Sequence, residues 1–314
     1  MFKPLAVAAA LLLAAAPALA QEPGEDAESV RAQVAAFVQP THEARTEAAM
    51  ALARSYGFEP EIETFQGGPD GAPREGRNVS FVVATAVGEG PYEPEILLVA
   101  HYDAVELEDG VLAHGVVDNA ASVVAVVRAA AALRLQHLDR DIRVVLFDQE
   151  ELGLIGARRW IETHGLQNVA AVVNSDVAAY GDTMMYGQNN GEQSALVTQV
   201  VRMVCAETAL SCVGYPNYPP SDDRAFSAAG APVVSLGFQD EIGAHQMWLA
   251  FNAPQGASGL APGFVPQVFR LIHSADDTME AVDPETVLLA AATYAEIAIA
   301  LARTLPERSG DGVD

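Results

Sequence analysis

The run ILLVA at residues 96–100 decides the fold class, because every position in it is apolar. A strand that is apolar throughout is typical of a sheet buried on both faces. Similar runs follow at 142–147 (IRVVLF), 169–175 (VAAVVNS) and 232–237 (PVVSLG). We therefore predict that these four segments are the buried strands of one central sheet.

Helical patterns separate these runs. An alanine- and valine-rich segment at 119–135 is predicted to be a helix, and so are 153–164, 194–205 and 284–305. Strands that alternate with helices form parallel βαβ units, whose helices cover both faces of the sheet. The sequence has no internal repeat and no linker that would divide it. The fold class expected is α/β, a single domain with a mostly parallel central β-sheet covered by helices on both faces.

The flanking elements are less regular. Apolar residues at helical spacing predict two helices before residue 56. Strands are expected at 61–65 and 78–86, on either side of the turn GGPDGAP, and a short strand is expected at 184–187.

Charge narrows the range of partners. The chain has 314 residues, 50% of them hydrophobic, which is the balance of a globular protein. Its 42 acidic residues outnumber the 17 basic ones and give a formal net charge of -25. A field of that sign repels phosphate backbones and acidic lipid surfaces, so nucleic acid is excluded as a partner.

Residues 1–20 resemble an export signal. Lys3 precedes an apolar run that ends in Ala18-Leu19-Ala20, the small-x-small pattern of a cleavage site. The alternative is a buried N-terminal helix. No later segment reaches roughly 18 consecutive apolar residues, so no membrane association is expected after signal removal. We expect a periplasmic or secreted protein, with a domain at 21–305 and a disordered tail at 306–314.

Cys205 and Cys212 are the only cysteines of the chain. In an exported protein such a pair can form a disulfide that closes a small loop. Two unpaired buried thiols are the alternative. A metal site is not indicated, because two cysteines supply too few ligands.

Ionisable residues follow the predicted buried strands. In open α/β sheets, ligands bind beyond the carboxyl ends of the strands. One histidine at such a place is usually scaffolding, and an acidic pair is usually a solvated helix start. Together, however, two histidines and three acidic residues form a nitrogen and oxygen ligand set suited to zinc. The candidates are two histidines, His101 and His273, and five acidic residues, of which three would be ligands: Asp103, Asp118, Glu150, Glu151 and Asp176.

These segments resemble the co-catalytic zinc exopeptidases, which include bacterial leucyl aminopeptidases, glutamate carboxypeptidase-like enzymes and glutaminyl cyclases. The resemblance covers roughly residues 28 to 305, and its motifs occur in the family's order. They are AHYDAV, HGVVDNAAS, FDQEELGLIGA, NSDV and IHSADDT.

The resemblance implies a site with two zinc ions. Asp118 would bridge the ions, His101 and Asp176 would complete one, and Glu151 and His273 the other. Asp103 would hold the second nitrogen of the His101 ring. Glu150 would be the general base that takes a proton from a zinc-activated water and delivers it to the leaving amine.

Candidates for substrate contact are less well defined. The stretch SDDRAF at 221–226 resembles a family stretch that usually reads Ser-Asp-His-x-x-Phe, so Asp223 replaces a common histidine. Residues 238–268 form a long connection, read either as a cover over the substrate pocket or as a surface excursion. The residues predicted to bind substrate are Tyr215, Tyr218, Asp222, Arg224 and Trp248.

The resulting hypothesis is an exported zinc aminopeptidase that acts on peptides. A glutaminyl-peptide cyclase with one zinc is the nearest alternative, although family cyclases place a tryptophan where this chain has Ile272. A carboxypeptidase would need a basic pocket, for which Arg224 is the one candidate. A non-catalytic scaffold on the same fold typically loses the base or a ligand, whereas every position is filled here. The sequence leaves the oligomeric state open.

Overall fold

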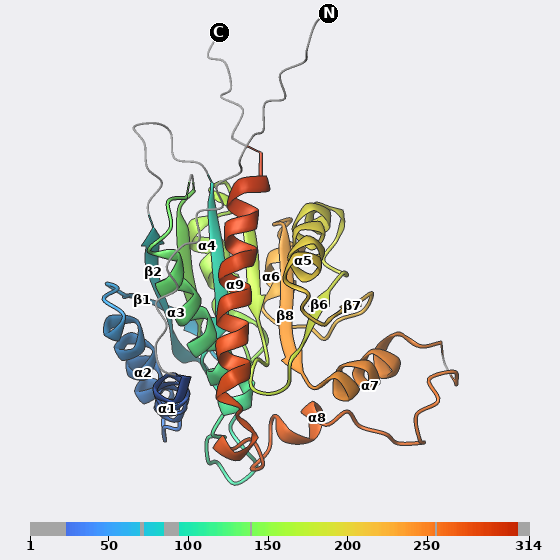
Figure 1. Cartoon of the computed structure of the whole chain (residues 1–314). Helices are drawn as coiled ribbons and strands as arrows, with labels where there is room; N and C mark the ends of the chain where they lie inside the picture. Colours follow the sequence, from blue (N-terminus) through green and yellow to red (C-terminus); the bar gives the residue numbers. More distant parts are fainter. Residues whose placement is uncertain (1–22, 70–71, 85–93, 139, 255, 307–314) are drawn as a thin grey trace, which may run out of the picture.

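The computed structural model describes residues 23–69, 72–84, 94–138, 140–254 and 256–306. Within them the strands form one eight-stranded sheet in the order β1-β2-β4-β3-β5-β8-β6-β7 (Figure 1). The strands are β1 (Glu61–Gly67), β2 (Arg74–Ala84), β3 (Glu95–His101), β4 (Ile142–Phe147), β5 (Val169–Ser175), β6 (Thr183–Gly187), β7 (Cys212–Tyr215) and β8 (Val233–Gln239).

The centre of the sheet is parallel, as predicted. Neighbouring strands run parallel through β4, β3, β5 and β8. Antiparallel pairing joins β1 to β2, β2 to β4 and β6 to β8. The outer strands therefore make the sheet mixed, while the strands that carry the candidate site share one direction.

Helices cover both faces of the sheet. One face packs on α1 (Pro23–Ala35), α2 (His42–Ser55), α3 (Ala121–Leu133), α5 (Ala195–Thr208) and α9 (Pro284–Thr304), and the other on α4 (Ile155–His164) and α6 (Asp223–Ala228) (Figure 1). Alternate residues of the run 96–100 face opposite sides of the sheet. Ile96 and Leu98 belong to the hydrophobic core on the first face, and Leu97 and Val99 belong to the core on the second face. This alternation explains why the strand is apolar at every position.

Two segments are long and apolar enough to cross a membrane by length and composition alone, Val116–Leu133 and Pro284–Thr304. Most of each is buried inside the domain, so both are core segments of the fold. Their apolar surface packs mainly against each other, since α3 and α9 lie side by side on the sheet (Figure 1).

The connections between these elements contain further short helices. These are the π-helix η1 (Val116–Ala120), the 3-10 helices η2 (Glu192–Ser194) and η3 (Met279–Ala281), and the helices α7 (Glu241–Asn252) and α8 (Val268–Leu271). In Figure 1, α7 and α8 lie past the lower end of the sheet. The segment 238–268, expected to be a long connection, contains the three-turn helix α7.

Cys205 and Cys212 form a disulfide between the end of α5 and the start of β7. This confirms the first of the two readings of the pair. The signal peptide at 1–20 and the disordered tail at 306–314 remain predictions, because residues 1–20 and 307–314 lie outside the described residues.

Candidate metal centre

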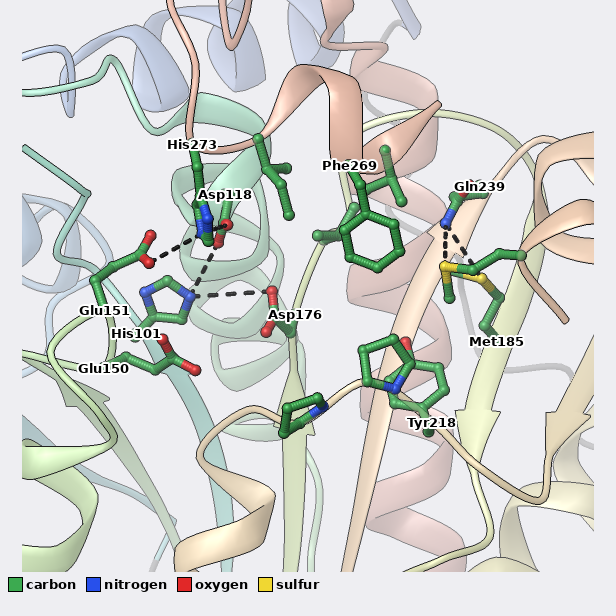
Figure 2. A pocket seen from close by; sticks show the side chains of 16 residues that line it. His101, Asp118, Glu150, Glu151, Asp176, Met185, Tyr218, Gln239, Phe269 and His273 are labelled. Carbon is green, nitrogen blue, oxygen red and sulfur yellow. Dashed lines mark hydrogen bonds and ion pairs between the residues drawn. The ribbon is translucent and has the colours of Figure 1, made fainter. Parts of the chain in front are cut away.

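The parallel strands bring the predicted ligands together at one edge of the sheet. His101 is the last residue of β3, Asp176 directly follows β5, and Glu150 and Glu151 follow β4. Asp118 comes from η1, between β3 and α3. His273 follows α8 and reaches the same place from the other end of the chain, as Figure 2 shows.

Asp118 lies at the middle of the group. Its Oδ1 is 3.1 Å from Nε2 of His101, and its Oδ2 is 3.1 Å from Nε2 of His273. His273 Nε2 also lies 3.0 Å from Glu151 Oε2, and His101 Nε2 lies 3.9 Å from Asp176 Oδ1. The two oxygens of one carboxylate therefore face two separate sets of ligand atoms.

Asp103 connects the first histidine to the two glutamates. Its Oδ1 lies 3.3 Å from Nδ1 of His101. The same carboxylate accepts hydrogen bonds from the backbone N–H groups of Glu150 (3.1 Å) and Glu151 (3.3 Å). A carboxylate behind a ligating histidine fixes the orientation of the ring. Here the carboxylate of Asp103 also fixes the backbone of Glu150, the expected base, and of Glu151, an expected ligand.

Arg45, which the sequence did not single out, holds the loops of the site from behind. Its side chain is fully buried. The guanidinium donates to five backbone carbonyls, those of Phe37, Tyr102, Asp103, His114 and Gly115. The fixed fork of donors of an arginine suits such a set of acceptors. One side chain of α2 therefore ties the loop after β3 to the loop before η1.

Asp277 holds the backbone of Asp118, the carboxylate expected to bridge the two ions. It accepts hydrogen bonds from the backbone N–H groups of Val116, Val117 and Asp118, at 3.1, 2.7 and 3.2 Å. One carboxylate thus holds three successive backbone N–H groups of the segment that carries Asp118. Asn119 completes the support, because its side chain bonds both the carbonyl of Ser175 and the N–H of Val177.

The backbone beside the site adopts sparsely populated conformations. Gln149, Val177 and His273 have φ values of 61°, 62° and 56°. A positive φ is uncommon outside glycine, and for a β-branched residue such as Val177 it costs more. Each of these residues is a candidate site residue or immediately adjoins one, so the strain is concentrated where side chains must be aimed.

Burial and mutual contacts shift the pKa values of the carboxylates and imidazoles of this group. Burial raises the pKa of Glu150 well above its usual range, that of Glu151 to about 7 and that of Asp176 to about 6. Hydrogen bonds with Asp118 and Glu151 raise the pKa of His273 to about 10. A cation placed between these side chains would replace the protons that they otherwise retain.

The donor set fits zinc. His101, Asp118 and Glu151 offer ligand atoms within 4.8 Å of one another, and so do His101, Glu150 and Asp176. Glu151 Oε1 is buried without a hydrogen-bond partner among the described residues. Imidazole nitrogen and carboxylate oxygen are ligands that zinc accepts, and an unpaired buried oxygen is costly unless something binds it.

A cavity of about 260 Å³ leads away from the metal centre (Figure 2). Beyond the candidate ligands its walls are mostly apolar. They are formed by Val177, Met185, Tyr218, Pro219, Pro220, Gln239, Met247, Val268, Phe269 and Ile272. The end opposite the metal centre is closed by Met185, Gln239 and Met247, none of them more than 2% exposed. The cavity is therefore a dead-end pocket beside the cluster.

The comparisons with known proteins agree with this geometry. Residues 82–298 match the model of Peptidase family M28. The chain belongs to peptidase family M28. The zinc exopeptidase family expected from the sequence is thereby confirmed.

Solved structures share the M28 fold at low sequence identity. A Zn-dependent exopeptidase from Parabacteroides distasonis has a TM-score of 0.67 and 17% identity, covering 90% of this chain and 99% of that one. A zinc aminopeptidase from Bacillus subtilis has a TM-score of 0.65 and 13% identity, covering 87% of this chain and 93% of that one. A glutaminyl cyclase from Porphyromonas gingivalis has a TM-score of 0.63 and 18% identity, covering 88% of this chain and 96% of that one.

Carboxypeptidase Q of Xenopus laevis is 26% identical over 165 residues. The match covers 52% of this chain and 29% of that relative. The chain thus spans less than a third of the length of the curated relative it matches.

The structure brings one of the five predicted substrate-binding residues, Tyr218, to the pocket wall. Tyr215 is buried, and its hydroxyl donates to the carbonyl of Ala244. Trp248 donates from Nε1 to the carbonyl of Gly214. Arg224 is engaged by the carbonyls of Asn189 and Tyr218 and by Asn190 Oδ1. Asp222 is buried outside the pocket lining, with both carboxylate oxygens unpaired among the described residues.

The replacement of the family's histidine by Asp223 has a local structural role. Asp223 is fully buried, and its Oδ1 accepts a hydrogen bond from the backbone N–H of Ser221, two residues earlier. Its Oδ2 lies 3.8 Å from Nε of Arg224. The side chain therefore stabilises the start of α6 and does not line the M28 pocket.

The segment 238–268 contributes directly to that pocket. Gln239 at the end of β8, Met247 in α7 and Val268 in α8 all line it. This arrangement supports the cover reading over the surface excursion.

Proposed function

We propose that this M28 protein is an exported zinc aminopeptidase that removes N-terminal residues from peptides. The observation that carries the proposal is that the two oxygens of Asp118 face different histidines, His101 and His273. His101 lies near Asp176, and His273 lies near Glu151. A carboxylate with two such sets of neighbours can bridge two ions, which is the arrangement of co-catalytic hydrolases.

The shape of the pocket supports action at a chain end. If the scissile carbonyl lies over the metal centre, the side chain of its residue enters the pocket, whose far end is closed by Met185, Gln239 and Met247. A closed pocket holds one side chain and does not pass a continuing chain. This favours an exopeptidase over an endopeptidase.

The charges around the pocket favour the amino end of the peptide. Four carboxylates line the cavity near the metal centre, and no arginine or lysine is among its described lining residues. A carboxypeptidase would need a cation for the terminal carboxylate, and Arg224 is already bonded elsewhere. The free α-amine of an aminopeptidase substrate needs no such cation, because in its neutral form it could bind an open position on the second ion.

When bound, zinc would polarise the scissile carbonyl and lower the pKa of a water. Glu150 lines the cavity beside the ligands and would take the proton of the attacking water and deliver it to the leaving amine. Asp103 holds the backbone of Glu150 in place throughout. Tyr218 is the one phenol in the pocket lining, and its hydroxyl would donate to the developing oxyanion.

A glutaminyl cyclase remains the second candidate, because a cyclase shares the fold with a TM-score of 0.63. Ile272 lines the pocket at the position where family cyclases place a tryptophan. An isoleucine offers no indole to stack on a substrate amide, which favours hydrolysis over cyclisation.

Export is proposed on two grounds. Residues 1–20 carry the pattern of a signal peptide, and the Cys205–Cys212 disulfide is the kind of bond that persists in oxidising compartments. The substrate is a peptide, and the net charge of -25 argues against nucleic acid as a partner.

The test is product analysis with three peptides and zinc-loaded protein. The proposal predicts release of free leucine from Leu-Ala-Ala and no cleavage of N-acetyl-Leu-Ala-Ala, which lacks the free amine. Release of the C-terminal alanine from both peptides would instead indicate a carboxypeptidase. Pyroglutamate formed from Gln-Ala-Ala, without hydrolysis of the leucyl peptide, would establish the cyclase.

A further inference from the structure

The closed end of the pocket is apolar except for one amide. Gln239 is 1% exposed and lies between two thioethers, with Nε2 at 3.5 Å from Met185 Sδ and 3.3 Å from Met247 Sδ (Figure 2). Sulfur accepts hydrogen bonds and does not donate them here, so this contact fixes which end of the amide faces the two methionines.

The hydrogen-bonding capacity of that amide is largely unused. Thioether sulfur is a weak acceptor, and Gln239 Oε1 is buried without a partner among the described residues. A buried polar group left in this state carries a free-energy penalty, which any better partner would remove. Gln239 lines the pocket and is otherwise buried, so a side chain that fills the pocket would come close to its amide.

We infer that Gln239 is a specificity-determining residue that contacts the tip of the substrate's first side chain and selects side chains with a neutral hydrogen-bonding tip, such as glutamine. The inference rests on the proposed function, which places that side chain in the pocket. Methionine side chains are flexible and polarizable, so Met185 and Met247 can adjust when the amide exchanges its sulfur contacts for a ligand.

The chemistry also excludes other classes of side chain. A charged tip would enter an apolar end that offers no charge of opposite sign, at a large desolvation cost. An apolar tip of the same length fits the walls but leaves the Gln239 amide with its weak contacts. A site built to hydrogen-bond a substrate group discriminates against the analogue that lacks it.

The experiment compares glutaminyl, norleucyl and alanyl p-nitroanilides with wild-type protein, Gln239→Met and Gln188→Met. Gln188→Met is the matched control, because Gln188 lies outside the pocket lining and bonds Tyr186 Oη. The quantity measured is the ratio of kcat/KM for the glutaminyl substrate to that for the norleucyl substrate. Release of p-nitroaniline reports hydrolysis alone, since cyclisation leaves the anilide intact.

The inference predicts that Gln239→Met lowers this ratio by about fivefold or more, the size of one neutral hydrogen bond. Alanyl turnover is measured in all three proteins as the reference for general damage to the site, and Gln188→Met should keep both the ratio and the alanyl turnover of wild type. A ratio unchanged in Gln239→Met, or lowered equally in Gln188→Met, would overturn the inference.

Failure of the proposed function gives a different result, since no p-nitroanilide would then be hydrolysed. In that case the affinities of L-glutamine amide and L-norleucine amide, measured by calorimetry, test the same ratio without turnover. The same fivefold change in Gln239→Met would support the inference, and equal ratios in both proteins would overturn it.

Discussion

Asp103 contacts three groups of the metal centre at once, the ring of His101 and the backbone N–H groups of Glu150 and Glu151. All three interactions use carboxylate oxygen as the acceptor. Because the residue is fully buried, no water can replace a lost acceptor.

The first prediction follows for Asp103→Asn. An amide of the same shape presents N–H to one of these donors, so the ring or the glutamate backbone must shift. We expect a loss of about 10–100-fold in zinc affinity or in kcat/KM. Zinc titration and leucyl p-nitroanilide hydrolysis measure the two effects, and wild-type values for both would rule out the role given to Asp103.

The role of Glu150 as the base can be distinguished by mutation from the role of a metal ligand. We expect Glu150→Gln to keep its zinc and to lose about 10²–10⁴-fold in kcat, because the amide cannot accept the proton of the water. Glu162→Gln, an exposed residue of α4, is the matched control. Loss of zinc in Glu150→Gln would make Glu150 a ligand, and activity near that of the control would exclude it as the base.

At the scale of elements, α2 holds two loops in register through Arg45. Five backbone carbonyls accept from this one guanidinium. Its pKa is lowered to about 10 by burial, while Asp103 and Asp277 oppose that change. The side chain therefore remains charged at neutral pH.

We expect Arg45→Lys to lower the free energy of unfolding by about 2–4 kcal/mol, because an ammonium has three donors and cannot span five acceptors. Zinc affinity should fall with it, since the loops that carry Asp103 and Asp118 lose their common anchor. Urea unfolding and zinc titration check the two effects. A variant as stable as wild type would show that the loops are held by other contacts.

Much of this arrangement could be predicted from the sequence, because buried parallel strands are continuous apolar runs and their carboxyl ends share one edge. This rule predicts that His101, Glu151 and Asp176 lie together, as they do in the structure. It did not find Arg45, because an arginine within an amphipathic helix resembles a surface residue and its partners are backbone carbonyls. It also missed β7 and α6, which are too short to show a period.

The substrate contacts were harder to predict for another reason. Tyr215, Arg224 and Trp248 are close in the sequence to residues that line the pocket. Their polar side-chain atoms, however, donate hydrogen bonds to backbone carbonyls. The direction of a side chain depends on the packing around it, which a linear pattern does not contain. Gln239, the polar group at the end of the pocket, lies two residues beyond the strand predicted at 232–237, whereas β8 extends to it and buries it.

At the scale of the whole molecule, the buried charges link stability to pH and metal. Burial raises the pKa of Glu151 to about 7 and that of Asp176 to about 6, both above their ordinary values. Hydrogen bonds with carboxylates raise the pKa of His273 to about 10. In each case the folded state binds more protons than the unfolded state between the two pKa values. Stability therefore falls as pH rises through that interval.

We therefore predict that the metal-free protein has a Tm several degrees lower at pH 9 than at pH 6, because the carboxylates ionise and His273 begins to lose its proton. Zinc should restore the Tm at pH 9, since it binds the deprotonated ligands. Differential scanning calorimetry with and without zinc measures both effects. A metal-free Tm that rises from pH 6 to pH 9 would contradict the electrostatics described for the site.

The central claim is that this chain holds two zinc ions around Asp118 for hydrolysis. The most direct test is the zinc content of the protein, measured by mass spectrometry after dialysis at pH 8 and paired with leucyl p-nitroanilide hydrolysis. The account predicts close to two zinc ions per chain, with activity that is lost on chelation and regained with zinc. Protein that retains no zinc yet hydrolyses the substrate at an unchanged rate would contradict it.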